Sequence, residues 1–141
     1  RVIGEVDPLD RDKVTRVIFC SGKVYYELVA ARRERNIQHI AIARLEQFYP
    51  FPQEAFEAEL ARYPAATEVV WCQEEPRNQG AWYWIASRQH LSRSLGGKQE
   101  LLLGSRPASP SPAVGYYSKQ NAQQKALIDS ALGEIGPYKP A

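Results

Sequence analysis

The stretch VTRVIFC at residues 14–20 is followed by the turn residues SG at 21–22 and by a helical pattern over 23–36. β-branched and apolar side chains fill the stretch almost without interruption, which is typical of a strand that is buried on both faces of a sheet. The three segments together predict a strand, a tight turn and a helix. This unit is the basic element of a parallel α/β fold.

The helix predicted after this strand has a clear apolar side. Val24, Leu28 and Ala31 recur at helical spacing and form one stripe. The charged residues at 32–35 follow the stripe, and we expect them to end the helix in solvent. The arginines among them suit the negative end of the helix dipole.

The same alternation continues along the chain. The patterns predict further strands at 38–45, 67–73 and 100–105. They also predict three further helices: one that begins after the proline-rich segment 50–52 and ends at 62, one at 81–95 and one at 118–132. A polar loop is predicted at 74–80. The expected inward helix positions are Phe56, Leu60, Ala122, Leu127, Ile128 and Ala131. Such alternation predicts the α/β class, as a three-layer α/β/α sandwich with a mostly parallel sheet.

Chain length and composition predict one folded domain. The chain has 141 residues, of which 44% are hydrophobic and 24% charged, as is ordinary for a single globular domain. Residues 1–13 are predicted to be an extended lead-in from a preceding domain, 14–133 the α/β domain, and 134–141 a disordered tail.

Several functional classes are disfavoured by simple counts. No apolar run reaches the roughly 18 residues that a membrane span requires, and the first residues lack the pattern of a signal peptide. A net charge of +2 does not indicate nucleic-acid binding. We therefore expect neither nucleic acid nor a membrane as a partner.

The cysteines and histidines offer little material for a reactive centre. Cys20 and Cys72 both lie inside apolar runs, which predicts buried, inert thiols in a reducing compartment. His39 and His90 are the two histidines, and neither has an evident nucleophile as partner, so both are interpreted as structural. These patterns predict neither a metal site nor a catalytic triad.

Ligands of parallel α/β domains bind at the carboxyl ends of the strands, and three predicted loops lie there, at 21–23, 73–80 and 106–115. The first, Ser21-Gly22-Lys23, joins a strand to a helix N-terminus, which is an arrangement that favours anions. It matches neither a dinucleotide fingerprint nor a P-loop. A tight turn with a helix cap is therefore the favoured interpretation.

The second loop carries two adjacent carboxylates, Glu74 and Glu75. Such a pair could serve as a general acid and base, because neighbouring carboxylates raise each other's pKa values. Arg77 and Lys23 could neutralise the pair, and a hydrogen-bonded loop or an interface cluster is the favoured interpretation. Four large rings, namely Trp71, Trp82, Tyr83 and Trp84, gather around the same loop and indicate a buried interface.

Five segments together resemble one family along nearly the whole chain. They are VIGE at 2–5, RVIFCSGKVYYEL at 16–28, ARLEQFYPFP at 43–52, VWCQEEPRNQGAW at 70–82, and RPAS with PAVGY at 106–109 and 112–116. They are similar to the C-terminal domain of the decarboxylating first component of 2-oxoglutarate dehydrogenase. The resemblance implies a transketolase C-terminal-like domain of a long, homodimeric subunit.

The family reaction implied by this resemblance is oxidative decarboxylation of 2-oxoglutarate with succinyl transfer to a lipoyl group, in the citric acid cycle. Thiamine diphosphate and magnesium would be bound by preceding domains, so that no catalytic, cofactor or metal residue is assigned here. The implied partners are those domains, the second subunit and the lipoyl-bearing succinyltransferase component. The implied location is the bacterial cytoplasm, or the mitochondrial matrix in a eukaryote.

Within this framework, the sequence predicts interface or effector contacts at Ser21, Gly22, Lys23, Glu74, Glu75, Arg77, Asn78, Gln79, Trp82 and Arg106. Two alternatives remain open at this point. One is a stand-alone nucleotide- or acyl-CoA-binding module that holds phosphate with residues 21–23 and Arg106. The other is the same domain of a dehydrogenase that acts on 2-oxoadipate.

Overall fold

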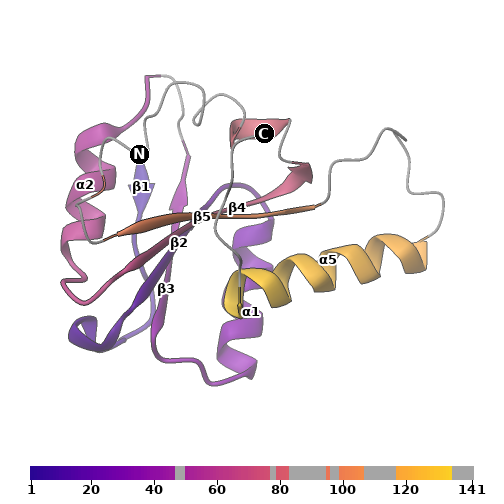
Figure 1. The fold of residues 1–141 in the computed structure, drawn as a ribbon, viewed down its shortest axis with the longest axis horizontal. Coiled ribbons are helices and arrows are strands. Elements are labelled where there is room, and N and C mark those ends of the chain that lie inside the picture. The colour runs from indigo at the N-terminus through magenta and orange to yellow at the C-terminus, as the bar shows by residue number, and fades with distance from the viewer. Residues whose placement is uncertain (47–49, 77–78, 83–94, 96–98, 107–116, 135–141) are drawn as a thin grey trace.

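The computed structural model describes residues 1–46, 50–76, 79–82, 95, 99–106 and 117–134. Its centre is a sheet of five strands in the order β1-β3-β2-β4-β5 (Figure 1). The strands are β1 Val2–Ile3, β2 Arg16–Cys20, β3 Ile40–Leu45, β4 Glu68–Pro76 and β5 Glu100–Arg106. Strands β2 to β5 run parallel and β1 pairs antiparallel with β3, which confirms the mostly parallel sheet.

Helices cover both faces of this sheet (Figure 1). They are α1 Val24–Glu34, α2 Gln53–Ala61 and α5 Tyr117–Leu132, with a short 3-10 helix η1 at Arg11–Lys13. Helix α2 packs on one face, whereas α1 and α5 pack on the other. The three-layer arrangement predicted from the alternating pattern is confirmed.

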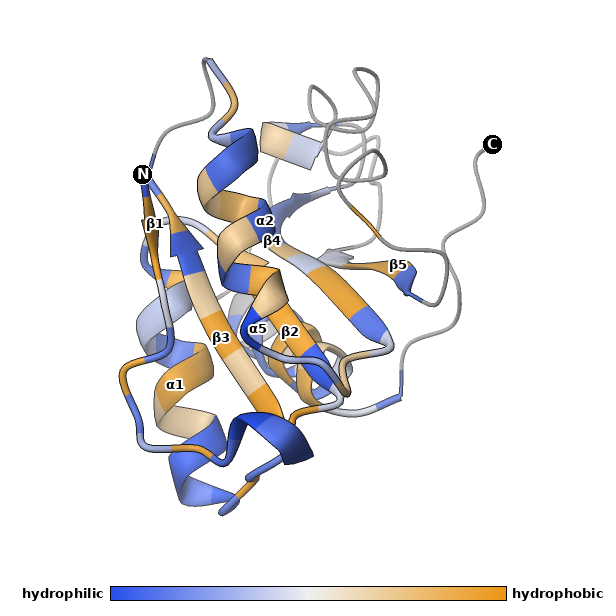
Figure 2. Ribbon diagram, turned by 90° about the vertical axis from the view of Figure 1, so that its left-hand side faces the viewer, coloured by the Kyte–Doolittle hydropathy of each residue, from blue (hydrophilic) through white to orange (hydrophobic). Residues whose placement is uncertain are grey.

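Strand β2 lies in the middle of the sheet and all five of its residues are buried. Its side chains alternate between the two faces, as they must in an extended strand. Val17 and Phe19 join the apolar cluster under α2, while Ile18 and Cys20 join the cluster under α1 and α5. Figure 2 shows the apolar residues along these central strands.

The inward helix positions are mostly as predicted. Phe56 and Leu60 of α2 are buried, and so are the three α5 positions Leu127, Ile128 and Ala131. The prediction for Ala122 is wrong, because this residue is exposed. It lies on the N-terminal part of α5, whereas the buried residues of that helix lie in its second half.

One prediction about charge is wrong. Arg32 was expected in solvent at the end of α1, yet 1% of its side chain is exposed. Its guanidinium donates to both carboxylate oxygens of Glu5, to Asp7 at 2.6 Å and to the carbonyl of Ile40 at 3.2 Å. The two carboxylate partners, Glu5 and Asp7, lie 27 and 25 residues away along the chain, beyond the reach of a helical pattern.

The lead-in segment is thereby part of the domain's own packing. Strand β1 pairs Val2 with Leu45 and Ile3 with Arg44. The Glu5 carboxylate also accepts the backbone N–H of Ile42 at 2.8 Å. The sequence patterns did not indicate this edge strand, because two residues are too few to show a period.

Strand β4 is longer than predicted. Residues 74–76 were expected in a loop, but β4 continues to Pro76, which pairs with Arg106 of β5. The register shifts between Cys72 and Pro76, so the extra residues are accommodated by an irregularity. Of the helix predicted at 81–95, only 81, 82 and 95 are described, and of the tail only 134.

Candidate functional site

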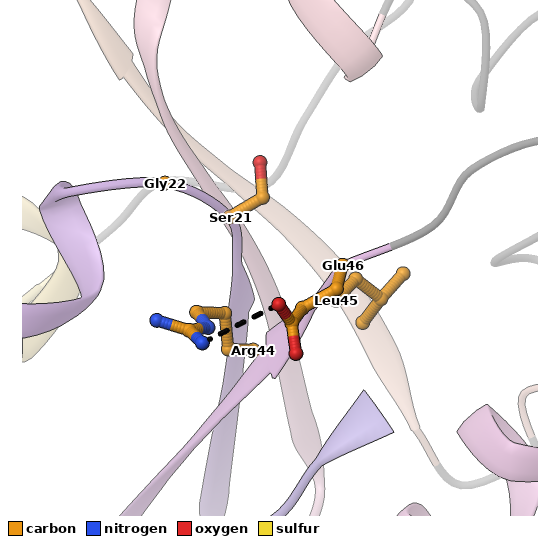
Figure 3. A pocket seen from close by; sticks show the side chains of 5 residues that line it. All are labelled: Ser21, Gly22, Arg44, Leu45 and Glu46. Atoms are coloured by element: carbon orange, nitrogen blue, oxygen red, sulfur yellow. Dashed lines mark ion pairs between the residues drawn. The ribbon is translucent and has the colours of Figure 1, made fainter. Parts of the chain in front are cut away.

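The carboxyl ends of β2, β3 and β4 lie along one edge of the sheet, as expected for parallel strands. A pocket of about 360 Å³ lies at the ends of β2 and β3 (Figure 3). Its lining consists of Ser21, Gly22, Arg44, Leu45 and Glu46. The register Cys20 to Arg44 explains why the Ser21-Gly22 turn and the end of β3 meet here.

The Ser21-Gly22-Lys23 segment is a tight turn. Gly22 has a φ of +74°, a backbone conformation that residues other than glycine rarely adopt. The residue at the helix cap is Lys23, and it forms no side-chain cap hydrogen bond. The predicted turn is therefore confirmed, but the residue at the cap position is Lys23 and not Ser21, which the sequence pattern offered as the cap.

Arg44 is a functional candidate that the sequence reasoning missed. Its Nη1 donates to the hydroxyl of Tyr26 at 2.8 Å, and its Nη2 lies 3.5 Å from Glu46. The guanidinium carbon lies 5.3 Å from the ring centre of Tyr25 and 5.6 Å from that of Tyr26. The hydrogen bond to Tyr26 raises the pKa of Arg44 above its usual value. In the sequence, Arg44 had only the signal of a cation within an apolar strand.

Glu74 takes part in a hydrogen-bonded cluster that joins β4 to α1 and α5. Lys23 Nζ lies 3.8 Å from Glu74 Oε1, as the proposed neutralisation by Lys23 requires. Gln124 Nε2 of α5 donates to the same oxygen at 2.9 Å, and also to the carboxylate of Glu27. Glu74 is thus held by a cation and an amide, which fits a structural cluster better than a general acid or base.

Glu75 points away from this cluster. The residue is exposed, and its side chain lies over Gly80, where an added Cβ atom would be 2.9 Å from Glu75 Oε2. A general acid and base pair would need both carboxylates to face one site. Because Glu74 and Glu75 have different surroundings, the geometry does not support the acid–base alternative.

The loop after β4 is organised by Gln73, another residue that the sequence reasoning missed. Its side chain is buried and forms hydrogen bonds to groups at both ends of the segment 71–82. Trp82, predicted as an interface contact, is 2% exposed and belongs to the cluster under α2. It therefore supports the loop from inside the domain. Gln79 is exposed, and its N–H donates to the carbonyl of Pro76 at 2.9 Å.

Two of the predicted contacts are not described by the structure, and a third is described in part. Arg77 and Asn78 lie outside the described residues. Arg106 ends β5, where its backbone pairs with that of Pro76, and its side chain is not described by the structure.

The two histidines were interpreted as structural. His39 precedes β3 and is exposed, and its carbonyl accepts the N–H groups of Thr15 and Arg16. His90 is outside the described residues.

Both cysteines are buried free thiols, and they lie opposite each other as register partners on the neighbouring strands β2 and β4. Burial raises the pKa of Cys20 well above its usual value, and burial together with Glu74 raises the pKa of Cys72 to about 12. Raised pKa values suppress the reactive thiolate. The prediction of buried, inert thiols agrees with these surroundings.

The described part of the chain contains no group of three or more His, Cys, Asp or Glu side chains that could hold a metal ion. No helix within it is long and apolar enough to cross a bilayer. The carboxyl edge thus presents turn amides, an arginine and paired carboxylates. These groups can form polar contacts with another protein surface or a small anion.

The arrangement of strands and helices belongs to the transketolase-like class of α/β domains. The chain is similar to a solved structure described as a split gene transketolase, inactive beta4 tetramer, with a TM-score of 0.59. The similarity covers 94% of this chain and 42% of that chain. Sequence identity is 16%, so this likeness shows the fold alone.

Within that class, residues 1–132 match the family described as 2-oxoglutarate dehydrogenase C-terminal, and the chain belongs to this family. The 2-oxoglutarate dehydrogenase E1 component of Cupriavidus necator is 52% identical over 95% of this chain. Those of Haemophilus influenzae and Coxiella burnetii are 50% and 47% identical, each over 93% of this chain. The chain spans about 14% of the length of each of these relatives. The resemblance inferred from the sequence motifs is confirmed.

Proposed function

We propose that this chain serves as the C-terminal domain of a 2-oxoglutarate dehydrogenase E1 component. The enzyme would oxidatively decarboxylate 2-oxoglutarate and transfer the succinyl group to a lipoyl-bearing partner. The observation that carries this proposal is the family match over residues 1–132, combined with the small share of each relative that the chain spans. In this role the domain contributes packing rather than chemistry.

The carboxyl edge of the sheet is the proposed contact surface with the rest of the subunit. It comprises Ser21, Gly22, Lys23, Glu74, Glu75, Gln79 and Arg106, with Arg77 and Asn78 in the adjoining loop. Polar and charged groups of this kind are typical of contacts between domains of one chain. Trp82 fixes the base of the loop from within the core.

Thiamine diphosphate and magnesium would be held by other parts of the subunit. Magnesium binds through oxygen ligands and the cofactor's phosphates. Here Glu74 is already engaged by Lys23 and Gln124, and Glu46 lies beside Arg44. These carboxylates do not fit a magnesium site, and we route no catalytic step through this domain.

The wider assembly follows from the same proposal. The partners would be preceding domains of the same subunit, a second identical subunit and the lipoyl-bearing succinyltransferase component. The relatives named above are bacterial, which supports a bacterial cytoplasmic location for the enzyme.

A chimera tests the proposed function. The matching segment of the Cupriavidus necator E1 component is replaced by this chain, and 2-oxoglutarate dehydrogenase activity is measured in the reconstituted complex. We expect activity within a few-fold of the parent, and little activity from a parent that lacks the segment. Full activity of the truncated parent would overturn the proposal.

Calorimetry tests the absence of a catalytic role. The chain is titrated with thiamine diphosphate in the presence of magnesium. We expect no saturable heat, because Glu46 and Glu74 at the carboxyl edge already have partners. Saturable binding would place cofactor chemistry in this domain and contradict the proposed division of labour.

A further inference from the structure

We infer that Gln73 is a positioning residue for the proposed contact surface. Its carboxamide joins Glu75, near the end of β4, to Gln79 and Trp82. Glu75 and Gln79 are thereby presented in one arrangement before any partner binds. The inference deepens the proposed function and rests on it for the identity of the partner. The local arrangement itself can be tested on the chain alone.

The Gln73 side chain is buried, with 3% of the residue exposed, and it uses both ends of its amide. Nε2 donates to the carbonyl oxygens of Glu75 at 3.0 Å, Pro76 at 2.9 Å and Gln79 at 2.9 Å. Oε1 accepts from the indole N–H of Trp71 at 2.9 Å and from the backbone N–H of Trp82 at 2.8 Å. One side chain therefore joins the strand, the loop and the residue that returns to the core.

These bonds satisfy polar groups near a disrupted part of the sheet. The register of β4 against β5 shifts between Cys72 and Pro76, and proline has no N–H to donate. The partly buried carbonyls of Glu75, Pro76 and Gln79 all accept from the Gln73 amide, and that of Pro76 also accepts from the Gln79 N–H. Leaving such a carbonyl without a donor is costly. An apolar side chain of similar size could fill the space but could not satisfy these carbonyls.

A second feature fixes the outer side of the same segment. Gly80 has a φ of +68°, and its open face is covered by the side chain of Glu75. Among the described residues, Gln73 thus holds residues 75, 76, 79 and 82 from inside, while the Glu75 side chain lies over Gly80 on the outside. A surface that is already ordered loses less conformational freedom when it binds.

The matched variant is Gln73→Glu. Glutamate has nearly the same shape and keeps oxygen acceptors for Trp71 and Trp82. At pH 8 its carboxylate has no hydrogen to donate to the three carbonyls. At pH 5 a carboxyl group buried beside carbonyls takes up a proton, because its pKa is raised there, and one donor is restored.

The measurement is amide hydrogen exchange of the full chain by NMR, expressed as protection factors at pH 5 and pH 8. In Gln73→Glu we expect protection of the Gln79 and Trp82 amides to fall about tenfold or more at pH 8, and to recover substantially at pH 5. The wild-type protein and Gln38→Glu, an exposed glutamine, should show no such pH dependence. A Gln73→Glu protein with wild-type protection at both pH values would overturn the inference.

A second variant keeps the inference testable if Gln73→Glu does not fold. Gly80→Ala leaves the core unchanged but places a Cβ atom 2.9 Å from Glu75 Oε2 at a positive φ. We expect faster exchange at Gln79, while amides of β2 stay protected. Unchanged exchange at Gln79 would contradict a segment held in one arrangement.

The chimera separates this inference from the proposed function. If the wild-type chimera is active, Gln73→Glu should lower its activity at pH 8 several-fold more than at pH 6.5, relative to the wild-type chimera. If the activity of the Gln73→Glu chimera, relative to the wild-type chimera, is the same at pH 8 and pH 6.5, the positioning role is overturned. If the wild-type chimera itself is inactive, the proposed function fails, while the exchange experiment still decides the local role of Gln73.

Discussion

Arg32 and Arg33 are neighbours in the sequence with opposite surroundings. The Arg32 side chain is 1% exposed and contacts Glu5 and Asp7, whereas that of Arg33 is 57% exposed and contacts Asp7 from outside. A buried charge that loses its partner is strongly destabilising, while an exposed ion pair contributes little. The two positions therefore form a matched pair for measuring what the lead-in contributes to stability.

We predict that Arg32→Ala lowers the free energy of unfolding by about 3 kcal/mol, because the buried Glu5 carboxylate loses its cation. Arg33→Ala should lower it by less than about 1 kcal/mol. Urea denaturation of both variants measures the difference. Similar losses in both would show that the network is not a buried one in solution.

From the lowered pKa of the Asp7 carboxylate we predict that the domain loses stability in acid. Its hydrogen bond from Arg33, with further help from Arg32, lowers the pKa of Asp7 from 3.8 to about 2. A group with a lowered folded-state pKa stabilises the fold above its unfolded pKa, and this contribution is lost as pH falls through the folded value. Stability should therefore decline between about pH 4 and pH 2. Asp7→Asn should make that part of the decline shallower in a series of urea titrations, and an unchanged slope would argue against the pair.

The two thiols give a chemical test at single residues. With the pKa of Cys72 raised to about 12, roughly one molecule in ten thousand carries its thiolate at pH 8. Cys20 is shifted in the same direction by burial. We predict that neither thiol reacts with a thiol-specific disulfide reagent in the native chain, and that both react in urea. Prompt reaction of the native protein would show that this face of the sheet opens readily.

At the scale of elements, Arg16 connects the start of β2 to the end of α5. Its Nη1 donates to the carbonyls of Ala131 at 2.8 Å and Gly133 at 2.6 Å, and its other nitrogens bind Glu68. The last carbonyls of a helix have no partner within the helix. Arg16 supplies one from a strand that lies more than a hundred residues earlier in the chain.

We predict that Arg16→Ala lowers the free energy of unfolding by about 2 kcal/mol and speeds amide exchange in the last turns of α5. Arg35 provides the control, because it also contacts α5 but through a half-exposed pair with Asp129. Arg35→Ala should have an effect below about 1 kcal/mol. Equal effects of the two substitutions would remove the special role of Arg16.

At the scale of the whole molecule, the local sequence patterns were sufficient to predict the three-layer architecture. Residues 14–20 have an apolar pattern that is typical of a central strand, and the parallel sheet with helices on both faces was predicted from its repetition. The family was also readable, because the motif around residues 70–82 is specific.

What the patterns missed depends on contacts between distant segments. Arg32 is polar in any sequence window, and it is buried only because Glu5 returns to it across the sheet edge. Gln73 looked like the end of a strand, and its importance arises from carbonyls that the fold directs toward it. Polar residues that organise a site through tertiary hydrogen bonds have no periodic signature.

The central claim is that the carboxyl edge of this domain faces the rest of an E1 subunit. Amide exchange of the chain alone, compared with the same residues inside the active chimera, tests it most directly. We predict that the amides of Ser21, Gly22, Lys23 and Gln79 gain protection in the chimera, while those of Asn36, Gln38 and His39 at the opposite edge do not. Protection confined to the opposite edge, or unchanged exchange at both edges, would contradict the account.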